Sequence, residues 1–204
     1  KLDATVMTAL DSIAWTFNIR GRDVSRTPVA LSYALLHADG TADFFVAPGK
    51  LTDTVRAHLG NSVRVHDRTA FPAALAGLAG KRVAVDPDRA VDAIFSALTA
   101  AGAKVERHRD PAVLAKAIKN PVELAGMRAA HVRDGVAVAR FLKWMEEVAP
   151  AGGLDELGAA ARLQAFREAG GLFKDLSFDT ISAAGPNGAL PHYKVDASTN
   201  RAIE

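Results

Sequence analysis

The sequence contains no cysteine among its 204 residues. Disulfide bonds and thiolate metal sites are therefore excluded. Intracellular proteins of ordinary cells seldom rely on disulfides, so a chain without cysteine is compatible with a reducing compartment. We expect a cytoplasmic protein.

Long apolar runs and a strong charge of one sign are absent too. The longest apolar candidate, residues 71–80, is interrupted by Pro72 and by glycines, and no run approaches the ~20 residues of a membrane-spanning helix. Lys and Arg number 25 against 23 Asp and Glu, so the formal net charge is only +2. The basic pI of 9.0 reflects this small excess and not a basic patch. We therefore expect neither a membrane nor a nucleic acid as partner.

Several common catalytic motifs are missing. The chain has no G-x-S-x-G nucleophile motif, no P-loop and no dinucleotide-binding fingerprint. Its histidines are scattered, and none follows the H-E-x-x-H spacing of zinc peptidases. We expect surface or packing roles for most of them, namely His37, His58, His66, His108 and His131.

The composition is that of a globular protein, with 49% hydrophobic and 24% charged residues. Residues 1–109 alternate strand-like and helix-like patterns with an Asp39-Gly40 hairpin signal. The predicted strands are 4–8, 29–37, 42–47, 63–66, 82–85 and 104–106. The predicted helices are 10–18, 51–59, 69–79 and two opened by Asp86-Pro87 and Asp110-Pro111. This alternation predicts an α/β domain with a mixed sheet and helices on its faces.

A second domain is predicted at residues 118–204. Asn120 is a good N-cap, Pro121 suits the first helical position and Glu123 completes a capping box, so a helix is expected over 121–148. Pro150 and two glycines end it, and a second helix is expected over 154–169.

The last segment holds the candidate site residue. Phe178 and Ile181 predict a buried strand, and the sequence Gly-Pro-Asn-Gly at 185–188 predicts a tight turn. Pro191 cannot donate to a sheet ladder, so the return segment 190–193 is expected to be an edge strand or a bulge that aims His192 into a cleft. Taken from the sequence alone, a solvated surface histidine is the other interpretation.

Four stretches of the chain resemble aminopeptidase P, the Xaa-Pro aminopeptidases of the pita-bread metallopeptidase family. The first is T-A-L-D-S-I-A-W at 8–15, followed by F-N-I-R-G at 17–21. The second is I-K-N-P-V-E-L at 118–124, and the similarity continues to residue 135. The others are F-K-D-L at 173–176 and the run S-F-D-T-I-S, G-P-N-G-A, H-Y and T-N-R within 177–201. The resemblance covers essentially the whole chain.

The resemblance implies a creatinase/prolidase N-terminal-like domain at 1–117, followed by the first part of a pita-bread catalytic domain at 118–204. It implies release of the first residue from peptides with proline in second position, and a full-length homodimer. It also gives His192 a catalytic, substrate-binding role beside a dinuclear centre of Mn²⁺ or Zn²⁺.

The family's metal ligands, two Asp, one His and two Glu, have no counterpart in this chain. Asp179, Asp196 and Glu204 do not match the ligand motifs, and the first ligand is expected past Glu204. The chain starts with Lys1 and not with Met, and we expect it to be a metal-free, inactive fragment of a longer enzyme. Two alternatives remain open: a non-catalytic pita-bread binding module, and a metal-free hydrolase of the creatinase type.

Overall fold

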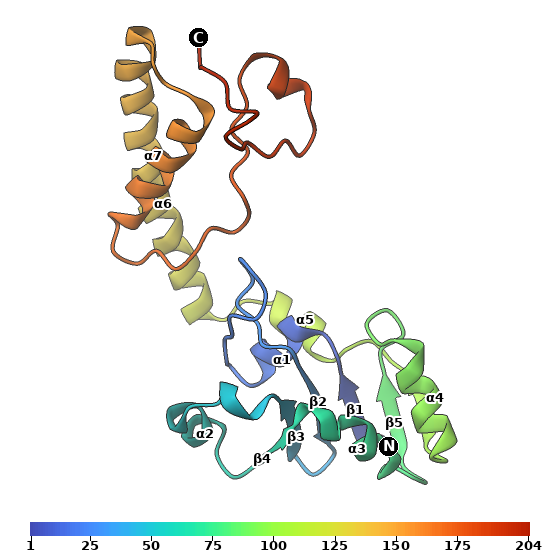
Figure 1. The fold of residues 1–204 in the computed structure, drawn as a ribbon. Coiled ribbons are helices and arrows are strands. Elements are labelled where there is room, and N and C mark those ends of the chain that lie inside the picture. The colour runs from blue at the N-terminus through green and yellow to red at the C-terminus, as the bar shows by residue number, and fades with distance from the viewer. The chain divides into compact units, whose positions relative to one another are not determined.

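The computed structural model describes residues 1–204. The chain divides into two compact units, Lys1–Ile118 and Lys119–Glu204. Figure 1 labels the helices α1–α7 and the strands β1–β5.

The first unit is built on a six-stranded mixed sheet with the order β4-β3-β2-β1-β5-β6 (Figure 1). The strands are β1 (Ala4–Met7), β2 (Ser32–His37), β3 (Ala42–Val46), β4 (Val63–Asp67), β5 (Arg82–Val85) and β6 (Lys104–Arg107). β2 lies antiparallel to β1 and β3, whereas the pairs β3–β4, β1–β5 and β5–β6 are parallel. The predicted α/β class with a mixed sheet is confirmed.

The predicted hairpin joins β2 to β3. Gly40 has a φ of 87°, which glycine adopts at little cost. The Asp39 carboxylate accepts a hydrogen bond of 2.9 Å from the backbone N–H of Thr41. This turn sets the register in which Leu36 lies opposite Ala42.

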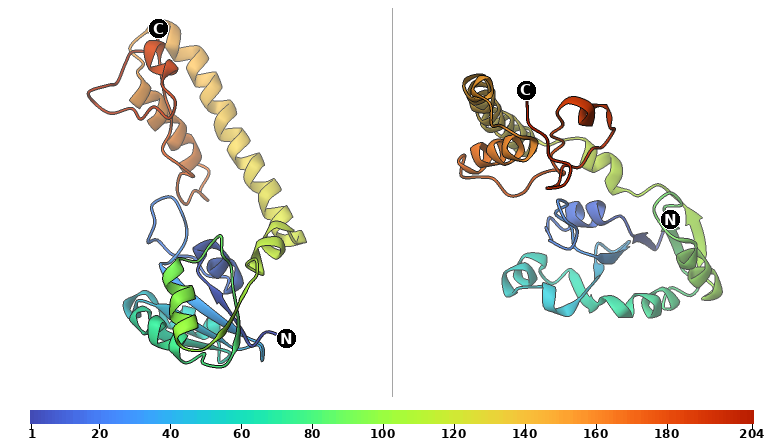
Figure 2. Two further views of the ribbon diagram at one scale, coloured as in Figure 1. Left: turned by 90° about the vertical axis from the view of Figure 1, so that its right-hand side faces the viewer. Right: turned by 45° about the horizontal axis from the view of Figure 1, so that its top comes forward.

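Helices cover both faces of the sheet. They are α1 (Leu10–Thr16), α2 (Asp53–Leu59), α3 (Phe71–Ala76), α4 (Asp92–Ala100) and α5 (Ala112–Ala117), with 3₁₀ turns η1 (Pro48–Lys50) and η2 (Arg68–Ala70). Residues of α3 and α4 pack with Val6 and Phe45 on one face, and residues of α1, α2 and α5 pack with Met7 and Phe44 on the other. Because neighbouring residues of a strand point to opposite faces, the sheet is buried on both sides, between two layers of helices (Figure 2).

The expected helix opening at Asp86-Pro87 is wrong, because α4 begins only at Asp92. The buried Asp86 carboxylate instead accepts hydrogen bonds from the backbone N–H of Asp88 at 2.9 Å and of Asp110 at 2.7 Å. Aspartate caps turns as readily as helices, so the sequence pattern fits both structures. Asp110-Pro111 does open a helix, since Asp110 accepts a hydrogen bond from the first residue of α5, Ala112, at 2.8 Å.

The second unit begins with the long helix α6 (Pro121–Val148), as predicted. It continues through η3 (Ala149–Ala151) to α7 (Glu156–Glu168), which packs against α6, and a single 3₁₀ turn, η4 (Gly185–Ala189), follows. Arg167 of α7 pairs with Asp134 of α6 at 2.6 Å, and the Arg162 guanidinium lies over the rings of Trp144 and Phe166. None of the helices is both long and apolar enough to cross a membrane.

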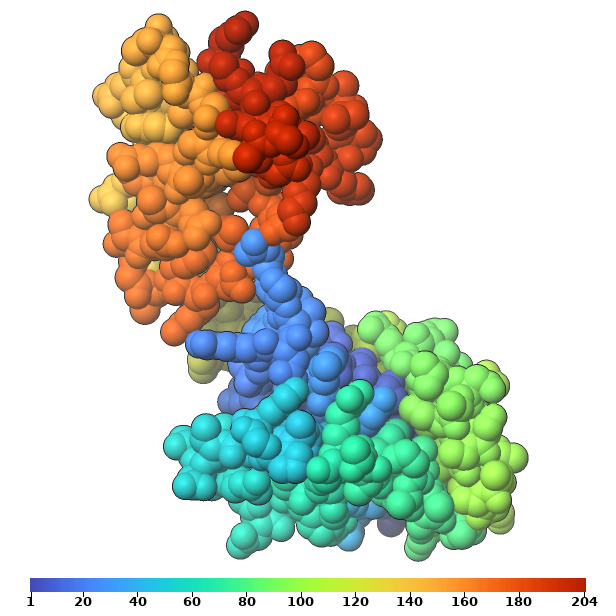
Figure 3. Space-filling model, viewed as in Figure 1, coloured from blue at the N-terminus to red at the C-terminus, as the bar shows by residue number.

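The strands expected around 178–181 and 190–193 are not formed. Residues 177–204 contain only the turn η4 and one isolated bridge, between Asp155 and Ala202. A strand needs a neighbour to accept and donate its backbone hydrogen bonds, and a lone pair of strands is marginal in water. With no partner strand within the second unit, Phe178 is 69% exposed. Figure 3 shows the segment (red) as an irregular mass beside the helical pair (yellow to orange).

Candidate functional site

Glu156, the first residue of α7, is the centre of the candidate site. The Asp155 side chain caps α7 by accepting a hydrogen bond of 2.6 Å from the backbone N–H of Gly158. The cap fixes where the helix starts and so places Glu156 in its first turn. There Glu156 has no solvent exposure at all, which is unusual for a carboxylate and requires hydrogen-bonding partners.

Those partners all come from the irregular segment 184–201. The Glu156 carboxylate accepts hydrogen bonds from the backbone N–H of Ala184 at 2.6 Å and of Arg201 at 3.1 Å. It also accepts from the Asn187 amide at 3.1 Å and from the Tyr193 hydroxyl at 2.9 Å. Burial raises the pKa of Glu156, but these hydrogen bonds outweigh it and hold the pKa below its usual value.

Tyr193 and Asn187 extend this network. Tyr193 is buried, and its hydroxyl lies 3.0 Å from the Thr199 hydroxyl and 2.9 Å from the Asn187 amide. Burial raises the pKa of Tyr193, and the bond to Glu156 adds to this effect. The Asn187 amide also reaches the Thr199 carbonyl at 3.0 Å.

A second set of bonds fastens the end of the segment to the start of α7. Asn200 donates to Asp155 at 2.8 Å and accepts from the backbone N–H of Leu157 at 3.1 Å. The backbone of Glu156 pairs with Arg201, and that of Ile203 with Leu154. Because the segment has almost no regular structure, these side-chain and backbone bonds define its path.

His192 lies in this segment, next to Tyr193. It is exposed, and its φ of 55° places it in the left-handed region that non-glycine residues seldom adopt. The backbone N–H of Tyr193 donates to the Leu190 carbonyl at 3.2 Å, which closes a turn around His192. The histidine is thus presented by a turn and not by the predicted edge strand or bulge.

The residues that hold this segment were not identified in the sequence. In the sequence, Asn187 is marked only as part of a predicted turn, and Tyr193 only as the neighbour of His192. Glu156 directly follows the N-cap of a helix, a position where many glutamates are exposed to solvent. The neighbouring sequence therefore does not indicate that Glu156 is buried. The one available signal is that the T-N-R and G-P-N-G motifs carry side-chain amides, which can both donate and accept hydrogen bonds.

The acids weighed as metal ligands lie apart from one another. Asp196 accepts local bonds from Ser198 at 2.7 Å and from Thr199 at 3.1 Å, which makes a turn, and Asp179 pairs with Lys194 at 3.3 Å. No group of three or more His, Asp or Glu in the chain could hold a metal ion. The residues present do not fit a dinuclear centre, and we derive no catalytic step through one.

A polar cluster in the first unit gathers two of the scattered histidines. Asp43 of β3 accepts from His37 at 2.5 Å, from His66 at 2.7 Å and from Arg64 at 2.7 and 2.9 Å. A hollow of about 390 Å³ lies beside it, between α3 and the strands. The imidazoles face Asp43, which indicates a structural role. The other histidines bond to backbone or to a neighbouring carboxylate: His58 to Phe17, His131 to Met127 and His108 to Glu106.

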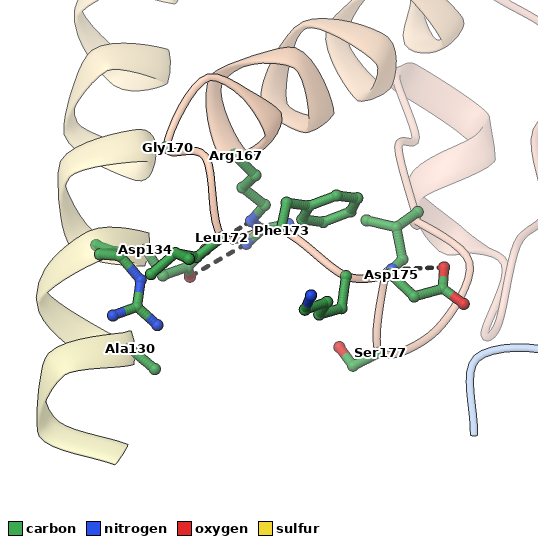
Figure 4. A pocket seen from close by; sticks show the side chains of 11 residues that line it. Ala130, Asp134, Arg167, Gly170, Leu172, Phe173, Asp175 and Ser177 are labelled. Atoms are coloured by element: carbon green, nitrogen blue, oxygen red, sulfur yellow. Dashed lines mark hydrogen bonds and ion pairs between the residues drawn. The ribbon is translucent and has the colours of Figure 1, made fainter. Parts of the chain in front are cut away.

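Another hollow, of about 350 Å³, lies in the second unit beside the Arg167–Asp134 pair. Figure 4 shows Arg167 reaching from α7 to Asp134 on α6, with Phe173 and Asp175 on the segment that follows. The hydrogen bond from Arg167 lowers the pKa of Asp134. Since the two charges satisfy each other, they link the helices and do not form a separate catalytic pair.

Comparison with known proteins accounts for both units. Residues 1–123 match the model of the creatinase/prolidase N-terminal domain. The chain belongs to this family. Residues 125–204 match the model of metallopeptidase family M24, so this member of the creatinase/prolidase N-terminal family continues into a metallopeptidase-like segment.

The relatives share one name. A Probable Xaa-Pro aminopeptidase P from Aspergillus clavatus is 39% identical over 214 residues, covering 100% of this chain and 32% of the relative. One from Aspergillus niger is 40% identical, covering 100% and 35%. The resemblance to aminopeptidase P is confirmed.

A solved structure agrees with them. The X-prolyl aminopeptidase of Caenorhabditis elegans, described as a cytosolic enzyme with a di-nuclear active site, matches with a TM-score of 0.89 and 32% identity over 99% of this chain and 34% of its own. The chain therefore spans about a third of the length of the relatives it matches.

Proposed function

We propose that this chain is the creatinase/prolidase N-terminal domain and the first part of the catalytic domain of an Xaa-Pro aminopeptidase. Such an enzyme removes the first residue from peptides with proline in second position. The observation that carries the proposal is the match of both units together to one X-prolyl aminopeptidase structure, with a TM-score of 0.89 over 99% of the chain. A match to the first unit alone would fit a protein with a different catalytic domain.

His192 is proposed to bind the substrate in the assembled active site. Its imidazole is exposed and sits on a segment tied down on both sides, by Tyr193 and by Leu190. Because the backbone around His192 is held, its imidazole projects from a defined point of the chain and can stabilise charge that develops on the peptide carbonyl. Its left-handed backbone conformation costs ~1–3 kcal/mol, and such strain persists mainly where the surrounding structure enforces it.

Further properties belong to the proposed parent enzyme. We propose that it is cytoplasmic and homodimeric and that it uses a dinuclear centre of Mn²⁺ or Zn²⁺, whose ligands come from the parent's own further residues. When bound, such metals supply a Lewis acid and an activated water. The residues of this chain contribute the scaffold and His192.

The test is a His192→Ala substitution in the longer protein that contains this chain. We expect kcat/KM for an Xaa-Pro peptide to fall by ~10²-fold or more, the scale for removing a transition-state donor, while the metal content stays nearly unchanged. His131→Ala is the matched control, because its exposed imidazole bonds only to its own helix, at the Met127 carbonyl.

Turnover of the His192→Ala protein at the wild-type rate would contradict the role of His192. The other candidate functions give different results in the same assay. A binding module would release no residue from any peptide, and a creatinase-type hydrolase would act without metal and would not require proline in second position.

A further inference from the structure

The hydrogen bonds that shape the segment around His192 converge on one carboxylate. Ala184 and Arg201, at the two ends of the segment, both donate their backbone N–H to Glu156, at 2.6 and 3.1 Å. Asn187 and Tyr193 donate to it from the middle. Glu156 is fully buried, so its carboxylate depends on these donors for its hydrogen bonds.

We propose that Glu156 is a positioning residue for His192, acting through Tyr193 and Asn187. This inference rests on the proposed role of His192 in substrate binding. Glu156 itself is enclosed and would not touch the substrate.

The path from Glu156 to His192 is short. Tyr193 follows His192 directly, and its hydroxyl is held by Glu156 at 2.9 Å and by Thr199 at 3.0 Å. Its backbone N–H is held by Leu190 at 3.2 Å. With both ends of Tyr193 fixed, the peptide unit of His192 is fixed as well, and its φ stays at 55°.

The site requires a carboxylate and not merely a polar group of that size. Four donors from four residues face the two oxygens of Glu156. A glutamine would offer one oxygen, and its NH₂ group would meet N–H or O–H donors instead of acceptors. Buried donors left without an acceptor are costly, so the segment would move away from α7 in a Glu156→Gln protein.

The first experiment uses the 204-residue chain and needs no activity. In the Glu156→Gln protein we expect amide hydrogen exchange at Ala184 and Arg201 to become about ten- to a hundredfold faster. Glu168→Gln is the matched control, because it makes the same change at an exposed position of the same helix, and it should leave these amides unchanged. Unchanged exchange at Ala184 and Arg201 in Glu156→Gln would overturn the proposal.

Tyr193→Phe serves if Glu156→Gln does not fold. The substitution keeps the aromatic ring and removes the hydroxyl that bonds to Glu156 and Thr199. We expect faster exchange at the Tyr193 amide in this variant, whereas the wild-type exchange rate there would count against the proposal.

The second experiment is a double-mutant cycle in the longer protein. A residue that acts only by positioning His192 loses its effect once His192 is gone. We therefore expect Glu156→Gln to lower kcat by about tenfold or more with little change in KM, and to lower it no further in the His192→Ala background. Equal losses in both backgrounds would show a general structural role and would overturn the proposal.

The two experiments separate this inference from the proposed function. If His192→Ala alone leaves activity unchanged, the role of His192 fails whatever Glu156 does. If His192→Ala lowers activity but Glu156→Gln lowers neither kcat nor amide protection, the proposed function stands and the positioning role fails.

Discussion

Asp43 shows how one residue can organise side chains from three strands. Its carboxylate lies opposite Arg64 across the β3–β4 ladder and diagonal to His37 on β2 and His66 on β4. Diagonal neighbours on one face of a sheet lie within reach of long side chains. Burial raises the pKa of Asp43, but the bonds from Arg64 and the two histidines outweigh it, so the pKa lies well below its usual value.

Asp43→Asn should lower the free energy of unfolding at pH 7 by about 2 kcal/mol, because charge-assisted hydrogen bonds to a partly buried group are lost. A carboxyl whose pKa is depressed in the folded state stabilises the protein above its unfolded pKa, near 4, and loses that contribution as the pH falls through the folded value. The gap between wild type and variant should therefore close as the pH falls below about 4.

Urea unfolding at a series of pH values measures this gap. Asp88→Asn, a change at an exposed carboxylate of the same unit, is the control and should stay within ~0.5 kcal/mol of wild type. A gap that stays at its full size as the pH falls well below 4 would contradict the assignment.

The second unit depends on α6 as an element. Its start is fixed by a capping box, in which Asn120 accepts from the backbone N–H of Glu123 at 2.9 Å and Glu123 accepts from that of Asn120 at 2.8 Å. Of its 28 residues only Ala137 is buried. A helix with so little burial depends more than most on its cap and on its contacts with α7.

Asn120→Ala should destabilise the second unit by about 1 kcal/mol through loss of the cap acceptor. Amide exchange in the first turn of α6 and thermal unfolding followed by circular dichroism measure the effect. Asn120→Asp keeps an acceptor and should behave like wild type, as should Asn61→Ala in an exposed turn of the first unit. Equal stability of Asn120→Ala and Asn120→Asp would show that the cap contributes nothing.

At the scale of the whole molecule, the second unit has apolar side chains that no other part of that unit covers. The side chains concerned are Val122, Val132, Leu142, Leu172, Phe178, Ile181 and Leu190, each more than half exposed. Exposed apolar groups gathered in one small unit favour association.

We expect the 204-residue chain to self-associate as its concentration rises, which chromatography with light scattering measures. Replacing Leu142 and Phe178 by serine should weaken the association, because both are exposed apolar groups of the second unit. Val91→Ser, at a 66% exposed position of the first unit, is the control. A monomer at every concentration would show that this surface does not drive contact.

We also expect the 204-residue chain alone not to hydrolyse Xaa-Pro peptides, even with added Mn²⁺ or Zn²⁺. Metal catalysis needs several ligands fixed on one centre, and no group of three or more His, Asp or Glu in the chain could hold a metal ion. Release of the first residue, measured beside calorimetric metal titration, tests this. Tight binding of two metals together with turnover would contradict it.

Much of the fold could be read from local patterns. The hairpin at Asp39-Gly40 and the long helix opened by Asn120, Pro121 and Glu123 depend on neighbouring residues alone, and both formed as predicted. The same local logic failed at Asp86, where turn and helix cap use the same side chain, and around Phe178, where a strand would need a partner.

The sequence by itself determined the element order of the first unit, the start of α6 and the motifs that identify the relatives, because these depend on short-range propensity and on residue identity. Only the tertiary structure decided that Glu156 is buried and receives bonds from residues 28 to 45 positions away, and that His37 and His66 meet at Asp43. Such contacts arise when distant segments exclude water from a shared polar group, and no local pattern encodes which segments will meet.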